Sequence, residues 1–272
     1  MKQSGFIIFF SIVLAIYAAV NYYIFIRGWQ ALPRGSSLRT YYVIIFLFVA
    51  LSIIAGRILE RIYLSCWSDI LVWIGSFWLA AMLYFFLIII FLDLARLANH
   101  FIPFFPTAVT GDYIKIKFIA GIISTALVLI IIMVAFINAS SPRIRNLDLS
   151  FAKSSPPSRQ LSLVAVSDIH LGTLVGKGRL NHLIDRINQL NPDIVILVGD
   201  IVDEDLAPVI REDLGATLRN IKSHFGVFAV TGNHEYYGGV EAAVKYMQDH
   251  GIIVLRDSVV NIDNALYLIG RD

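Results

Sequence analysis

Four long apolar runs in the first half of the chain constrain its fold more than any other feature. They cover about residues 5–26, 41–59, 70–92 and 118–137. About 20 consecutive apolar residues suffice to cross the hydrocarbon core of a bilayer as a helix. Hydrophobic residues make up 57% of the chain, more than a soluble core requires. We therefore expect residues 1–138 to form a four-helix transmembrane region of a multi-pass protein in contact with the lipid bilayer.

The first run is too long for the apolar segment of a signal peptide, so we interpret it as a retained helix. Four spans place both ends of the chain on one side of the membrane. Lys and Arg near the span ends set the orientation, but the two faces carry nearly equal numbers of them. We expect the soluble half to be cytoplasmic, because only the membrane segments themselves could direct it to export. Asp93 and Arg96 are expected to form an i, i+3 pair at the interface, without a functional role.

The composition changes after Asn138. Ser and Pro are frequent in residues 139–160, which we interpret as a linker containing a short edge strand near residues 144–151. Strand and helix patterns then alternate, which favours a parallel sheet built from βαβ units. The expected strands are residues 161–167, 193–198, 227–231 and 252–255; the expected helices are 177–190, 208–224 and 240–250; a hairpin over 259–269 turns at Asp263-Asn264.

The two halves of the chain differ in charge. Residues 1–150 contain eleven Lys and Arg against five Asp and Glu, whereas residues 151–272 contain eleven against fifteen. A basic membrane half is suited to anionic lipid headgroups, and an acidic soluble half is better suited to divalent cations than to nucleic acid. Basic residues interleaved with aromatics, the pattern of a nucleic-acid site, are missing from the sequence, so we expect no nucleic-acid partner.

Three polar motifs each follow an expected strand. They are Asp168-Ile169-His170, Gly199-Asp200-Ile201-Val202-Asp203 and Gly232-Asn233-His234-Glu235. Each motif alone occurs often by chance, but the ordered set, spaced by about thirty residues, is much more specific. Ligands bind at the carboxyl ends of the strands in such sheets, so these side chains are expected to gather at one edge.

The residue types in these motifs indicate a centre of two divalent metal ions. Asp168 and His170 can share one cation, Asp200 can bridge two, and Asn233 offers a carboxamide oxygen to the second. Oxygen and nitrogen ligands without thiolate favour Mn²⁺, Fe or Zn²⁺. Two-metal centres support in-line attack at phosphorus.

The second and third motifs also contain residues suited to proton transfer. His234 is expected to donate a proton to the leaving group, and Asp203 is expected to orient and charge it. Glu235 is expected to support the loop from outside the ligand set.

Residues 161–272 resemble the calcineurin-like metallophosphoesterase superfamily, and most of all its bacterial branch with several preceding membrane helices. The similarity extends beyond the motifs, through residues 191–200 and 226–237. It implies a four-layer α/β/β/α sandwich and the same roles for the residues named above. It also implies hydrolysis of a phosphomonoester, phosphodiester or pyrophosphate bond in a phosphorylated small-molecule or lipid-linked substrate, such as an envelope component.

The family pattern continues with an isolated metal-binding histidine and a Gly-His-x-His element, and the sequence ends before both. We therefore interpret residues 161–272 as the N-terminal part of such a domain, with one sheet face exposed, weak metal binding and negligible turnover. His182, His224 and His250 are expected to be surface or capping residues. The alternative hypothesis is a four-helix membrane sensor or transporter-like protein with an inactive phosphoesterase-like docking domain, although the spans lack a central charge that would favour transport.

Overall fold

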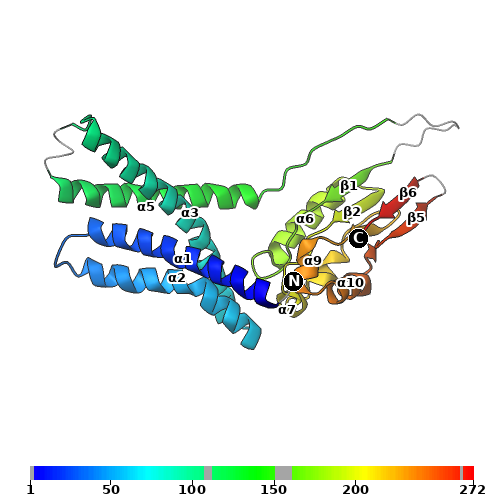
Figure 1. Ribbon diagram of the computed structural model, residues 1–272. Helices are drawn as coiled ribbons and strands as arrows, with labels where there is room; N and C mark the ends of the chain where they lie inside the picture. Colours follow the sequence, from blue (N-terminus) through cyan, green and yellow to red (C-terminus); the bar gives the residue numbers. More distant parts are fainter. Residues whose placement is uncertain (1–2, 107–111, 151–160, 264–265) are drawn as a thin grey trace. The chain divides into compact units, whose positions relative to one another are not determined.

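The computed structural model divides the chain into two compact units, Met1–Ser141 and Pro142–Asp272. The structure describes residues 3–106, 112–150, 161–263 and 266–272 (Figure 1). The first unit is helical, and the second contains strands and helices.

The described residues of the first unit form four long helices, as the apolar runs predict. They are α1 (Gln3–Ala31), α2 (Leu38–Ile62), α3 (Cys66–Phe101) and α5 (Tyr113–Ala139), and all four are long and apolar enough to cross a membrane. Helix α3 begins earlier than predicted because Ser65 and Ser68 form a reciprocal capping box at its start. Asp112 caps α5 by accepting a hydrogen bond from the backbone N–H of Lys115 at 3.1 Å.

Helices α2 and α3 pack closely through two glycines. A Cβ at Gly75 would collide with the backbone of Ile53, and one at Gly56 would lie 2.8 Å from the backbone nitrogen of Val72. Small residues of this kind let membrane helices approach each other, since dispersion contacts replace the hydrophobic effect inside lipid. The two glycines therefore set the spacing of this helix pair.

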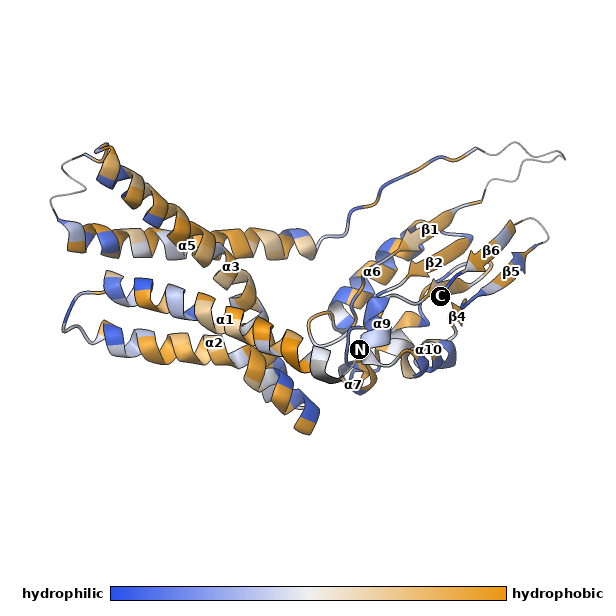
Figure 2. Ribbon diagram, viewed as in Figure 1, coloured by the Kyte–Doolittle hydropathy of each residue, from blue (hydrophilic) through white to orange (hydrophobic). Residues whose placement is uncertain are grey.

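The residues of the helical unit are hydrophobic along most of each helix and more hydrophilic at the loop ends of α1, α2 and α5 (Figure 2). Large side chains such as Ile45, Phe91 and Ile123 are 60–70% exposed. An apolar surface this extensive suits contact with lipid and not with water. It agrees with the predicted membrane location of this unit.

The second unit contains the predicted parallel sheet. Its strands are β1 (Leu163–Val166), β2 (Ile194–Val198), β3 (Val227–Val230) and β4 (Ile253–Val254), in the spatial order β1-β2-β3-β4. Helices α6 (Lys177–Gln189) and α10 (Val240–Asp249) fall within one residue of their predicted ranges. The strand and helix periodicities were therefore sufficient to define this architecture.

The two faces of the sheet are covered differently. Val195 and Leu197 pack in a core with the apolar sides of the helices. Ile194 and Ile196, which alternate with them, pack against the predicted hairpin of β5 (Ser258–Ile262) and β6 (Leu266–Gly270). Part of the second face is exposed, as expected: four apolar side chains there and on the hairpin are 45–74% exposed, namely Leu163, Val198, Tyr267 and Ile269.

Two predicted elements are wrong. The single helix over residues 208–224 is two short helices, α7 (Leu206–Arg211) and α8 (Leu214–Leu218). Asp213 separates them with a left-handed φ of 50°, which no α-helix accommodates. Residues 142–150, which include most of the predicted edge strand, have no regular structure. Phe151 and Asn264, at the end of that strand and in the hairpin turn, lie outside the described residues.

Candidate metal centre

The three polar motifs lie at one edge of the parallel sheet. Strands β1, β2 and β3 end at Val166, Val198 and Val230, each within a few residues of a motif. Beyond the sheet the first two loops stay paired, because the backbone N–H of His170 donates to the carbonyl oxygen of Asp200 at 2.9 Å. The carboxyl ends of neighbouring parallel strands thus bring the motifs together, as predicted.

The backbone at the first two motifs is left-handed. Asp168, His170 and Asp200 have φ values of 55°, 52° and 50°. Left-handed conformations are uncommon for residues other than glycine and cluster at functional sites, where the surrounding structure maintains the strain. Here they turn the two loops sharply as they leave the sheet.

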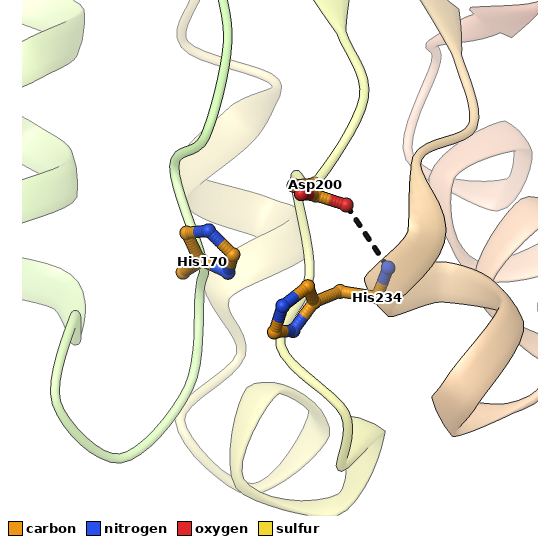
Figure 3. Close-up of side chains that lie close together, drawn as sticks. All are labelled: His170, Asp200 and His234. Carbon is orange, nitrogen blue, oxygen red and sulfur yellow. Dashed lines mark hydrogen bonds between the residues drawn. The ribbon is translucent and has the colours of Figure 1, made fainter.

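His170, Asp200 and His234 lie close together (Figure 3). Each offers a ligand atom, and these atoms all lie within 4.8 Å of one another. All three side chains are partly buried, and the rings of His170 and His234 meet edge to face with centroids 4.4 Å apart. The imidazole of His170 and the carboxylate of Asp200 are donors that Mn²⁺, Fe and Zn²⁺ accept, so this pair fits a divalent cation, and His234 lies within reach of the same position.

Asp203 lies beside both imidazoles. Its Oδ1 atom is 3.1 Å from Nδ1 of His234 and 3.9 Å from Nδ1 of His170. A carboxylate at Nδ1 accepts a hydrogen bond from the tautomer that carries a proton there, and so orients the ring. The structure therefore pairs Asp203 with His234, the two residues that the sequence suggested for proton transfer.

Asp168 and Asn233 occupy more open positions. Both are exposed, Asp168 just after β1 and Asn233 at the start of α9 (Asn233–Gly238). Among the described His, Cys, Asp and Glu residues, the close cluster contains His234 and does not include Asp168. Metal ligation by Asp168 and Asn233 accordingly stays a prediction.

Glu235 holds two of the motif loops together from beneath. Its side chain is 1% exposed, and its carboxylate accepts four backbone N–H groups at 2.7–3.0 Å. The donors are Asp200, Ile201, Val202 and Gly232. A buried carboxylate is stable only when hydrogen-bonded in this way. It fixes the loop carrying Asp200 relative to the loop carrying Asn233 and His234.

Two glycines permit the close approach of these loops. A Cβ at Gly232 would collide with the carboxylate and backbone nitrogen of Asp200, and one at Gly199 would lie 3.0 Å from the Cα of Gly232. Gly199 also has a φ of 71°. Asp200 uses the resulting proximity to accept a hydrogen bond from the backbone N–H of His234 at 2.9 Å (Figure 3).

A supporting network around Asp272 was not predicted from the sequence. Its carboxylate accepts hydrogen bonds from Thr231 Oγ1, Tyr236 Oη and Arg256 Nε at 2.6–2.7 Å. Hydrogen bonds from Tyr236, Thr231 and Arg256 lower the pKa of Asp272 to about 2. Thr231 and Tyr236 flank the third motif, so this network fixes that segment from its outer side. The partners lie as far as 41 residues apart in the chain, and short-range patterns carry no signal for them.

The remaining histidines of this unit lie outside the cluster. Nδ1 of His250 lies 2.7 Å from the carbonyl oxygen of Tyr246, one turn earlier in α10, and the His224 ring packs on Phe225. His182 is exposed on α6. These positions fit the surface and capping roles expected for them.

A parallel sheet with histidine and aspartate side chains gathered at its carboxyl edge, preceded by four membrane-type helices, defines a membrane-attached, metal-binding α/β protein. Comparison with known families narrows this class of protein further. Residues 161–271 match the family model described as calcineurin-like phosphoesterase. Residues 161–271 are therefore similar to calcineurin-like metallophosphoesterases, a family of hydrolases that use divalent metals.

Individual relatives agree with this assignment. An uncharacterized metallophosphoesterase of Campylobacter jejuni is 28% identical over 257 residues, which cover 90% of this chain and 63% of that protein. A Danio rerio transmembrane protein with a metallophosphoesterase domain is 33% identical over 121 residues, which cover 44% of this chain and 27% of that protein. An uncharacterized metallophosphoesterase of Helicobacter pylori is 33% identical over 104 residues, which cover 38% of this chain and 28% of that protein. The matched regions thus span about a quarter to two thirds of these relatives. No solved structure matched the chain.

Proposed function

We propose that the protein is a membrane-anchored, metal-dependent phosphoesterase that cleaves phosphomonoester, phosphodiester or pyrophosphate bonds. The observation that carries the proposal is the cluster of His170, Asp200 and His234 at the carboxyl edge of the sheet, with Asp203 beside both histidines. The proposed organisation is a four-helix membrane region over residues 1–138, a linker over 139–160 and the phosphoesterase region over 161–272.

The proposed ligand set consists of Asp168, His170, Asp200 and Asn233. Two divalent ions held there would neutralise charge that builds up on the phosphoryl group and activate the attacking water. Asp200 is suited to a bridging role because it lies between the first and third motif loops. The left-handed turns and the four hydrogen bonds to Glu235 fix the backbone of the loops that carry these residues, which supports the proposed set.

His234 is the proposed proton donor to the leaving oxygen. In the protonated ring proposed for this step, the Nδ1–H group donates a hydrogen bond to the Asp203 carboxylate, 3.1 Å away. The opposite nitrogen, Nε2, then delivers its proton to the alkoxide or phosphate that leaves. The same carboxylate keeps the ring oriented while the proton moves.

The substrate class we propose is a phosphorylated small molecule or a lipid-linked phosphate, including envelope components. The apolar helices support the lipid-linked class, because a chain anchored in the bilayer meets lipid-linked phosphates there. We further propose that this region faces the cytoplasm, with both ends of the four-helix region on that side.

Metal binding by the purified full chain tests the proposal. Mn²⁺ affinity, measured by calorimetry in detergent, should fall at least roughly tenfold in Asp200→Asn, since even outer support residues alter metal affinity that much. His182→Ala is the matched control, because it removes an exposed imidazole away from the cluster and should leave Mn²⁺ affinity unchanged.

Hydrolysis of bis(p-nitrophenyl) phosphate provides the second measurement. Whatever turnover the chain shows should require Mn²⁺ and disappear in His234→Ala. Turnover that survives chelation, or Mn²⁺ affinity equal in Asp200→Asn and wild type, would contradict the proposed function.

A further inference from the structure

A groove lies between α1 and α2 on the helical unit. Its volume is about 320 Å³, and its exposed lining is entirely apolar. The residues that matter here are Ala18, Tyr22 and Phe25 of α1, and Phe46 and Leu51 of α2. Tyr22 and Leu51 are 67% and 56% exposed, so the groove opens on the surface that faces lipid. Its shape and chemistry suit a hydrocarbon chain.

One end of this groove leads to a positive charge through stacked aromatic rings. The Phe25 ring stacks on the Trp29 ring with centroids 6.1 Å apart. The guanidinium carbon of Arg39 in turn lies 4.7 Å from the centroid of Trp29. Trp and Tyr are typical of the membrane interface, where an apolar body and a polar edge are both accommodated. The apolar groove therefore ends close to a cation at the expected level of the headgroups.

Arg39 retains hydrogen-bonding capacity. Among the described residues, its guanidinium makes one hydrogen bond, from Nη2 to the carbonyl oxygen of Leu32 at 2.9 Å. Its Nε is buried without an acceptor, so the donors left for a ligand are the other terminal N–H groups. A guanidinium has five N–H donors in a planar fork that matches the oxygens of a phosphate. The bond to Leu32 and the Trp29 ring hold this fork in a fixed orientation.

The surrounding chain adds positive charge without a compensating carboxylate. Residues 27–40 contain three arginines and neither Asp nor Glu. Arg27 pairs with Asp93 of α3 at 2.5 Å, so that charge is already neutralised. Arg34 is exposed and, with Arg39, leaves the α1–α2 connection positively charged. This charge complements an anionic headgroup.

We propose that the α1–α2 groove and Arg39 form a binding site for one anionic phospholipid. One acyl chain occupies the apolar groove, and the lipid phosphate accepts hydrogen bonds from Arg39. The site is separate from the metal centre, since it uses no residue of the second unit. It would remain if the protein hydrolysed no phosphoester.

The test is lipid retention on the purified full chain, measured by native mass spectrometry after titration with dioleoylphosphatidylglycerol. Dioleoylphosphatidylcholine supplies the same chains without net charge, and glycerol 3-phosphate supplies the phosphate without chains. Arg39→Ala removes the cation, and Ala18→Phe fills the groove from an exposed position. Arg61→Ala is the matched control, because it removes an exposed arginine from the opposite end of α2.

We expect phosphatidylglycerol to bind more tightly than phosphatidylcholine. Glycerol 3-phosphate should bind weakly and dissociate from the protein on dilution. Arg39→Ala should weaken phosphatidylglycerol binding by roughly fivefold or more, the usual effect of one basic residue near an anionic surface. Ala18→Phe should weaken both lipids, Arg39→Lys should restore part of the preference, and Arg61→Ala should change neither.

Equal losses in Arg39→Ala and Arg61→Ala would overturn the proposal, because they would indicate a diffuse charge effect. Equal affinity for the two lipids, or tight binding of glycerol 3-phosphate alone, would overturn it as well. Helical circular dichroism and monodisperse elution identify any variant that has failed to fold. If Arg39→Ala fails to fold, the phosphatidylglycerol affinity of Arg39→Lys, which retains charge and length, is compared with that of Arg61→Lys instead.

Discussion

Glu235 carries more of the site's structure than any residue that the sequence suggested as a ligand. Its carboxylate is the common acceptor for four backbone N–H groups from two loops. The sequence indicated a supporting role for it because it follows Asn233 and His234. The identity of its four donors depends on how two loops pack, and local patterns do not specify that.

Replacing Glu235 by glutamine should destabilise the second unit. The amide keeps the shape but turns N–H groups toward backbone donors, and each buried donor left unsatisfied costs about 1–3 kcal/mol. Urea unfolding followed by circular dichroism would measure the change. Glu204→Gln, at an exposed position, is the control. Equal stability of Glu235→Gln and Glu204→Gln would contradict the structural role of the buried carboxylate.

Asp272 predicts a pH dependence of stability. Its pKa falls from the ordinary 3.8 to about 2 in the folded protein, so its carboxylate stabilises the fold above pH 3.8. This contribution is lost as the pH falls from about 4 to about 2. Asp272→Asn should therefore flatten the acid limb of a urea-midpoint profile over that range. A variant that loses stability with acid as steeply as wild type would show that other carboxylates are responsible.

At the scale of elements, the periodicity of apolar residues predicted most helices and strands. The strands up to β4, helices α6 and α10, and the four apolar helices follow from spacing and length. The break between α7 and α8 depends on one left-handed residue, Asp213, inside a pattern that continues through it. The left-handed turns at Asp168 and Asp200 escaped prediction similarly, since aspartate adopts this conformation only where the surrounding structure favours it.

The α2–α3 pair should depend on its glycine contacts. Gly75→Leu inserts a side chain where even a Cβ collides with Ile53, and overpacking of this kind typically costs about 1–3 kcal/mol. Thermal unfolding of the purified chain in detergent should show a lower midpoint than wild type. Gly5→Leu, which faces open space on α1, should leave the midpoint unchanged. Comparable midpoints for the two variants would contradict close packing at Gly75.

At the scale of the whole molecule, the chain combines four membrane-type helices with a region, residues 161–271, that is similar to calcineurin-like phosphoesterases. The Campylobacter relative aligns over 90% of the chain, so its similarity extends into the helical region. Composition and hydropathy predicted the membrane half and the α/β half, because a surface in lipid must be apolar and a surface in water must be largely polar. Composition and hydropathy do not predict ion pairs between distant residues, such as Arg27 and Asp93. Asp93 pairs at 2.5 Å with Arg27 of another helix and only at 3.6 Å with the expected Arg96.

The central claim is that the histidine and aspartate cluster binds a divalent metal. Electron spin-echo envelope modulation of Mn²⁺ bound to the full chain tests this most directly, because it detects imidazole nitrogen coordinated to the ion. We predict histidine nitrogen modulation that is lost in His170→Ala and retained in His182→Ala. Bound Mn²⁺ without such modulation, or with modulation unchanged in His170→Ala, would contradict the proposed metal centre.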